Sequence, residues 1–266
     1  MTNDARTNWR ERGAWVALFL VFTPVLIDLA RHVATNSWAV YALAFPPLAL
    51  VVVHATPRSG SHVVPALFAV VLGMGIEAIA LASGTLRLGR IGFVVCVAAV
   101  LLLEGRFRMR TAVLLGLCVP LPHWILERTA AGFLYPIADA LAAMDRASGT
   151  PALALGASVE RVSGVMLLEA VDAGLTAGVL GFGLAWFAFT RRHASFAETL
   201  GLSFMMAVLG VGVHLVATLL TFHVGSGAEL DSLRWIRDAV AYGGVAVVVA
   251  GLFRLPMLWT RPAKPT

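Results

Sequence analysis

The feature that most constrains this chain is a succession of long apolar runs separated by short charged segments. Each run approaches the roughly 20 residues that a helix needs to cross the hydrocarbon of a bilayer. The runs lie near residues 14–30, 38–54, 63–83, 90–103, 111–126, 165–190, 198–222 and 238–256. Pro120 and Pro122 interrupt the end of the fifth run. The pattern predicts an all-α polytopic membrane protein with about eight spans, within a range of seven to nine.

The composition indicates that the chain folds in a lipid bilayer and not in water. Of the 266 residues, 59% are hydrophobic and 13% are charged, whereas water-soluble globular chains carry roughly 25% charged residues. The formal net charge of +5 is explained by basic residues that flank membrane spans, so we expect lipid contacts and no nucleic-acid partner. No linker or repeat divides the chain, which predicts a single membrane domain over residues 1–266.

The distribution of Lys and Arg predicts the orientation. An even number of spans places both termini on one side, and the loops of that side hold the larger share of the basic residues. They include the dense clusters RFRMR at 106–110 and TRRH at 190–193. Short basic loops stay on the cytoplasmic side, so both termini are expected in the cytoplasm. The first run lacks a small-x-small cleavage site and is expected to remain as the first span.

One long connection, roughly residues 127–163, falls on the outer side of this topology. Its apolar side chains recur at helical spacing, at Phe133, Ile137, Leu141 and Met144. Asp139, Asp145 and Arg146 take other positions around the helix. The pattern predicts an amphipathic helix in the outer interface. Residues 149–156 then read as a turn-rich return to the membrane.

Ionisable residues inside spans cost roughly 2.5 to 3.5 kcal/mol each, so each one needs a reason. Glu169 and Asp172 are three residues apart near the start of the sixth run, which would place them on one face of a helix. His214 lies in the outer half of the seventh run. Arg234 and Arg237 precede the eighth run at the same boundary. These five groups are therefore expected to meet in one outer layer.

Four of these five residues, all except the deeper Asp172, also have a simpler interpretation. Glu169 could be a solvated carboxylate at a helix start, favoured by the helix dipole. His214 could be a hydrogen-bonded packing residue, and the two arginines could anchor the eighth span in lipid headgroups. Glu77 is isolated in the third run, and we expect it to join the same outer cavity.

Residues 100–256 resemble the exosortase/archaeosortase family of polytopic membrane enzymes. The resemblance begins at Val119-Pro-Leu-Pro122, continues through the long outer segment and reaches Glu169-Ala-Val-Asp-Ala-Gly-Leu175. The family reads Glu-Ala-Cys-Ser-Gly-Leu at that last motif. His214 matches the arginine of the family's Asn-x-x-Arg, and Arg237 matches its third landmark, a His or Arg at the start of the last core helix.

The resemblance implies a bacterial or archaeal inner-membrane protein with an outward-facing cavity that admits the tail of an exported protein. In the family, a cysteine thiolate stabilised by cations attacks a peptide carbonyl. Here Val171 and Asp172 stand at the cysteine position, and neither supplies a thiol. Cys96 and Cys118 belong to other runs and read as buried, unpaired thiols. This sequence therefore departs from the family at the residue that would carry the reactive atom.

Three functions follow from this pattern. The first is a non-catalytic binding or assembly component for exported proteins or envelope polymers, with a protein partner that presents a C-terminal tail helix. The alternative is a membrane peptidase or transferase in which Asp172, His214 and Arg237 do acid/base work. A proton-coupled transporter subunit is a further alternative, with a relay formed by Glu77, Glu169, Asp172 and His214. We expect no metal and no cofactor; haem ligation by His214 with His32 or His123 is the remote exception.

Overall fold

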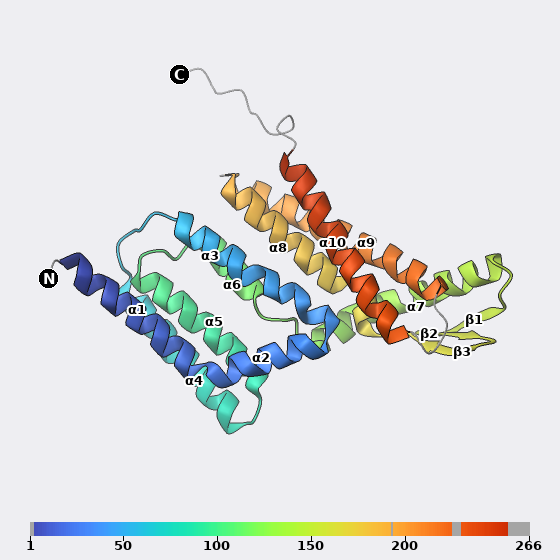
Figure 1. The fold of residues 1–266 in the computed structure, drawn as a ribbon, viewed down its shortest axis with the longest axis horizontal. Coiled ribbons are helices and arrows are strands. Elements are labelled where there is room, and N and C mark those ends of the chain that lie inside the picture. Colours follow the sequence, from blue (N-terminus) through green and yellow to red (C-terminus); the bar gives the residue numbers. More distant parts are fainter. Residues whose placement is uncertain (1–2, 193, 225–229, 255–266) are drawn as a thin grey trace, which may run out of the picture. The chain divides into compact units, whose positions relative to one another are not determined.

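The computed structural model describes residues 3–192, 194–224 and 230–254, and it is predominantly helical (Figure 1). The chain folds into two compact units, and the single membrane domain over 1–266 stays a prediction. The N-terminal unit comprises residues 1–120, and the C-terminal unit comprises residues 121–266.

Seven helical segments form the N-terminal unit. They are α1 (Asn3–Val21), α2 (Thr23–Thr35), the 3-10 helix η1 (Ser37–Ala44), α3 (Phe45–Ala55), α4 (Val63–Ala82), α5 (Leu86–Leu103) and α6 (Met109–Leu117). The helices α4 and α5 follow two of the predicted runs closely and form a tight hairpin. Their backbones approach so closely that a Cβ at Gly73 would lie 2.9 Å from the carbonyl oxygen of Gly92. Small residues at a helix contact permit this approach, as in many membrane helices.

Two of the predicted runs are broken in the N-terminal unit. The first run bends by 64° between α1 and α2, where Pro24 enters the first turn of α2. Proline lacks the N–H that would continue the helix, which explains the break. The fifth run ends as a helix at Leu117, before Pro120 and Pro122, and the chain becomes helical again only at His123. At 1.5 Å per residue, nine-residue α6 is about 14 Å long, too short to cross a bilayer alone.

The C-terminal unit combines helices with a small sheet. Its elements are α7 (His123–Ala147), β1 (Ala152–Leu155), β2 (Ser158–Arg161), β3 (Gly164–Leu167), the 3-10 helix η2 (Ala170–Ala173), α8 (Leu175–Arg191), α9 (Phe196–Val224) and α10 (Leu230–Arg254). The helices α8, α9 and α10 pack against one another, and α7 lies against the sheet and η2 (Figure 1).

A helix forms where the amphipathic helix was predicted, and its apolar stripe has a protein partner. In α7, Ile137 and Leu141 are buried in a cluster with Val159 of β2 and Met166 of β3. Phe133, on the predicted stripe, is 43% exposed. The apolar side of α7 therefore packs largely on the sheet.

The three strands correct the prediction for residues 149–168. They form an antiparallel meander in the order β1-β2-β3, in which Leu155 pairs with Ser158 and Arg161 pairs with Gly164. The sixth run was predicted to be helical from residue 165, but its first residues form β3 and α8 begins only at Leu175. The reason is visible in the burial of alternate residues, since Met166 is buried whereas its neighbours are exposed.

Within the described residues, three helices are long and apolar enough to cross a membrane: Val63–Ala82, Leu86–Leu103 and Phe196–His223. The bent pair α1 and α2 adds a fourth if it forms one broken span. Two shorter apolar helices, Ala39–Ala55 and Leu175–Arg191, fall below that length. These helices are compatible with a membrane protein, and the count of eight spans stays a prediction.

Candidate functional site

A buried ion pair between Asp172 of η2 and Arg237 of α10 forms the centre of the candidate site. Nη1 of Arg237 donates a hydrogen bond to Oδ1 of Asp172. The same guanidinium reaches Oδ1 of Asp238, through Nε at 2.8 Å and Nη2 at 2.7 Å. The three side chains are at most 3% exposed. One arginine thus holds two carboxylates in a region closed to solvent.

The backbone around Asp172 explains why its side chain points inward. Glu169 is the N-cap of η2, and its N–H donates to Oδ2 of Asp172 at 2.7 Å in a capping box. Gly174 ends η2 with φ of 78°, a left-handed conformation that glycine adopts without strain. The prediction that Glu169 and Asp172 share one face of a long helix is therefore wrong. Glu169 caps a single 3-10 turn, and Asp172 lies within that turn.

A second ion pair covers the first. Nη1 of Arg234 lies 2.9 Å from Oε1 of Glu169, and its Nη2 lies 3.7 Å from Oδ2 of Asp172. The Glu169 side chain is 53% exposed, whereas that of Arg234 is 16% exposed. Arg237 is therefore buried more deeply than Arg234, which lies one turn away on α10. Arg237 is too deeply buried to act as the headgroup anchor that its sequence position also suggested.

His214 of α9 is buried beside this pair. Neither ring nitrogen has a hydrogen-bond partner among the described residues. A Cβ added at Gly174 would lie 3.0 Å from Cβ of His214, so the histidine packs directly on the backbone that follows Asp172. One helical turn further along α9, the hydroxyl of Thr218 donates to the carbonyl oxygen of Asp172 at 3.4 Å. Asp172 makes no direct hydrogen bond to His214.

The structure thus brings five of the six predicted residues into the C-terminal unit. Asp172, Arg237, Glu169 and Arg234 are joined by ion pairs, and His214 lies beside them through Gly174. Glu77 belongs to α4 of the N-terminal unit. There its carboxylate is buried without a hydrogen-bond partner among the described residues, and it lies against Gly89 of α5.

Both cysteines also belong to the N-terminal unit. Cys96 is buried at the close contact of α4 with α5, beside Gly73. The Cys118 thiol donates to the carbonyl oxygen of Leu114 at 3.4 Å.

Sequence reasoning missed two partners of the site. Asp238 was taken as the first residue of the last apolar run, but it is 2% exposed and binds Arg237. Thr218 was not singled out, because a threonine in an apolar helix carries no specific signal. The Asp238 signal was available, since a second buried charge directly after Arg237 requires a partner.

A second buried charge network in the same unit was also missed. Asp145 of α7 accepts hydrogen bonds from Nε of Arg161 at 2.6 Å and from Nη2 at 3.1 Å. Nδ1 of His223 lies 2.9 Å from the same carboxylate. Nη2 of Arg161 also donates to the carbonyl oxygen of Phe222 at 2.6 Å. Phe222 connects the two networks, because the Arg237 guanidinium carbon lies 5.8 Å from the centre of its ring.

Within the described residues, no group of three or more His, Cys, Asp or Glu side chains is arranged to hold a metal ion. Comparisons of the chain with protein-family models, with curated proteins and with solved structures gave no match.

Proposed function

We propose that this chain is an exosortase-like integral membrane protein that binds exported proteins or envelope polymers without catalysing their cleavage. In this proposal the eight apolar runs are embedded in a bacterial or archaeal inner membrane, with both termini in the cytoplasm. The broken first run and the short α6 are the incomplete spans of that arrangement. Residues 127–173 and the start of α10 lie at the outer face, so Glu169 and Arg234 form the mouth of the site.

The observation that carries this proposal is the state of Asp172. Its position matches the reactive cysteine of the family, but its carboxylate is 0% exposed and is held by Arg237 and the N–H of Glu169, with Arg234 at 3.7 Å. A nucleophile or general base must lie within reach of a substrate. A carboxylate that is fully buried and bonded in this way instead holds η2 against α10, which suits a binding role.

A specific observation also favours the enzymatic alternative. His214 places two unpartnered ring nitrogens in a buried region directly beside Gly174, and orphaned buried polar groups often mark functional sites. In this alternative, opening of the Glu169–Arg234 pair admits a substrate, and His214 becomes its general base while Arg237 stabilises negative charge. The two proposals differ in whether His214 is needed.

The test replaces His214 with leucine in the full chain, expressed in its native membrane with an affinity tag. The partners that co-purify in mild detergent are quantified by mass spectrometry for the wild type and for His214→Leu. The binding proposal expects the same partners at yields within about twofold, because leucine fills the space and leaves Arg237 with both carboxylates. Loss of the cellular function with intact folding and partner recovery would instead support the enzyme.

A charge reversal at the mouth supplies the matched control. Glu169→Arg places two cations together and should lower partner recovery, whereas the double variant Glu169→Arg with Arg234→Glu restores the pair and should recover it. Unchanged recovery in the single variant would contradict the proposal that these residues form the binding mouth.

A further inference from the structure

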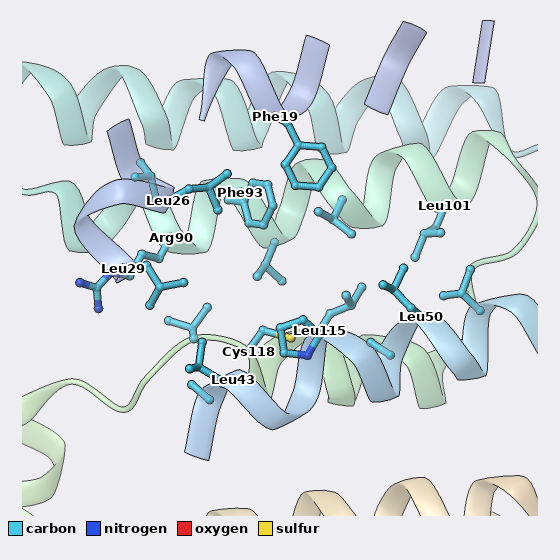
Figure 2. Close-up of a pocket in the computed structure, with 18 of the residues that line it drawn as sticks. Phe19, Leu26, Leu29, Leu43, Leu50, Arg90, Phe93, Leu101, Leu115 and Cys118 are labelled. Carbon is cyan, nitrogen blue, oxygen red and sulfur yellow. The ribbon is translucent and has the colours of Figure 1, made fainter. Parts of the chain in front are cut away.

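The N-terminal unit contains a cavity of about 250 Å³ that the proposed function does not use. Helices α1, α2, η1, α3, α5 and α6 all contribute to its wall. The lining side chains are almost entirely aliphatic or aromatic, among them Phe19, Leu43, Leu50, Phe93 and Leu115 (Figure 2). A cavity with such walls excludes water and accepts hydrocarbon.

The cavity extends along α5. Along α5 its lining extends from Arg90 to Leu101, which lie at opposite ends in Figure 2. From Arg90 to Leu101, eleven steps of 1.5 Å of rise give a length of about 16 Å. A single acyl chain fits an apolar cavity of this length.

One end of the cavity is charged. Arg90 lines it, is 5% exposed and pairs with Asp28 at 2.6 Å, and its Nε has no hydrogen-bond partner among the described residues. The Asp28 side chain is 32% exposed, so this end opens toward the surface. Arg87 and His32 lie close to the same pair. Glu77 of α4 lies against the adjacent Gly89, so the end holds carboxylates as well as arginines. What it offers to a headgroup phosphate is the Arg87 guanidinium and the Nε–H of Arg90.

We propose that the cavity holds one acyl chain of an anionic phospholipid, with the headgroup phosphate at the Arg90 end. The lipid tail fills the apolar length beside Phe93 and Leu115, where an empty cavity would forfeit dispersion contacts. The phosphate accepts hydrogen bonds from Arg87 and from the unused Nε of Arg90. Asp28 keeps Arg90 in place by accepting a hydrogen bond from its Nη2.

The test uses the full chain reconstituted in phosphatidylcholine vesicles that contain a minor fraction of phosphatidylglycerol with a diazirine near the end of one acyl chain. After irradiation, peptide mapping locates the cross-links. The lining segments of α5 and α6 should be labelled several-fold more than the exposed face of α4, where Val71 lies. Equal labelling of the cavity and of the α4 face would overturn the proposal, since ordinary annular lipid would then explain both.

Filling variants test occupancy directly. Val97→Phe and Ala49→Leu fill the cavity from α5 and from α3, and each should lower cavity labelling at least about fivefold. Val71→Phe, on the exposed face of α4, is the matched control and should leave labelling unchanged. Two separate filling variants distinguish loss of the site from misfolding, which thermal melting of each variant also monitors. Undiminished labelling in folded filling variants would refute the proposal.

The headgroup is tested with the same diazirine carried on phosphatidylcholine. Weaker cavity labelling is expected from it, and Arg87→Gln should remove the difference between the two lipids. Excess inorganic phosphate should not change the preference for phosphatidylglycerol. If phosphate abolishes that preference, the basic end binds free phosphate and the headgroup assignment is wrong.

Discussion

The double role of Arg237 predicts that its loss is more destabilising than loss of either carboxylate. Arg237 is the buried cation shared by Asp172 and Asp238. Arg237→Met keeps much of the side-chain volume but strands two carboxylates that are nearly inaccessible to solvent. Asp172→Asn keeps the shape of the side chain and leaves Arg237 with one of its two partners.

The expected destabilisation of each variant follows from the number of ion-pair partners that it loses. Removal of one partner from a buried ion pair destabilises a protein by about 3 to 5 kcal/mol. Arg237→Met should reach or exceed the upper part of this range, because two anions lose their cation. A hydrogen bond to a charged group contributes about 1.5 to 3 kcal/mol, which sets the expected effect of Asp172→Asn. Arg234→Met, one turn away in the more exposed pair with Glu169, should cost less than about 1 kcal/mol.

The assay is equilibrium unfolding of the purified chain in mild detergent by titration with a denaturing detergent, followed by far-UV circular dichroism. The expected order of destabilisation is Arg237→Met, then Asp172→Asn, then Arg234→Met. Equal destabilisation by Arg237→Met and Arg234→Met would refute the reasoning, because burial would then make no difference. An Asp172→Asn variant that unfolds as early as Arg237→Met would show that Asp238 is not a genuine partner of Arg237.

Three further predictions use the same unfolding measurement. His214→Leu should leave stability unchanged or raise it, since it removes two unpartnered buried nitrogens; a loss above about 2 kcal/mol would reveal a hidden partner. Gly174→Ala should destabilise the protein by more than about 1 kcal/mol, because φ is 78° and the new Cβ meets His214. Gly212→Ala, which has open space around it in α9, should stabilise it by about 0.5 to 1 kcal/mol. The opposite order of stability would count against the geometry of η2. Arg161→Met should destabilise by about 3 kcal/mol through the buried Asp145, and exposed Arg146→Met should have little effect; similar effects of the two would show that the Asp145 network is dispensable.

Hydrophobic periodicity predicted the helices well where the chain is uniformly apolar. The runs at 63–83 and 90–103 appear as α4 and α5 with small shifts at their ends. The bend between α1 and α2 was not predicted, because mean hydropathy over a window of residues is little affected by Pro24. The backbone hydrogen bonds of the helix, in contrast, are interrupted there. The length of the first apolar run therefore predicted one continuous helix where the structure has two.

The sheet was missed for a different reason. Residues 152–167 are short apolar segments between glycines and polar residues, and a run of four residues has too few periods to distinguish a strand from the start of a helix. Because β3 passes directly into η2, the error moved the start of the sixth helix ten residues upstream. Asp172, Arg234 and Arg237 were nevertheless singled out, since charges in an apolar setting stand out whatever the local backbone does.

Contacts within the site could not be read from the sequence, because they depend on which turn of α10 meets η2. Arg234 and Arg237 are three residues apart and look equivalent in the sequence. Packing places Arg237 1% exposed and leaves Arg234 at 16%. The contact that Glu77 makes could not be read from the sequence for a related reason: an isolated carboxylate in an apolar run indicates a buried group, but the sequence does not say that it lies against Gly89 of α5.

The two charge networks of the C-terminal unit meet at Phe222, and this meeting determines how the site can open. The Phe222 carbonyl is bound by Arg161, and its ring lies beneath Arg237, so β2, α9 and α10 are held to one residue near the end of α9. Separating η2 from α10 at depth would strand Asp172 and Asp238 and disturb this junction at once. Separating Glu169 from Arg234 breaks a pair whose carboxylate is 53% exposed, and the contact of Arg234 with Asp172 at 3.7 Å is lost only if the Arg234 side chain itself moves. In the proposed binding role, access for a partner should therefore begin with movement of the Glu169 and Arg234 side chains, while Arg237 and Phe222 stay fixed.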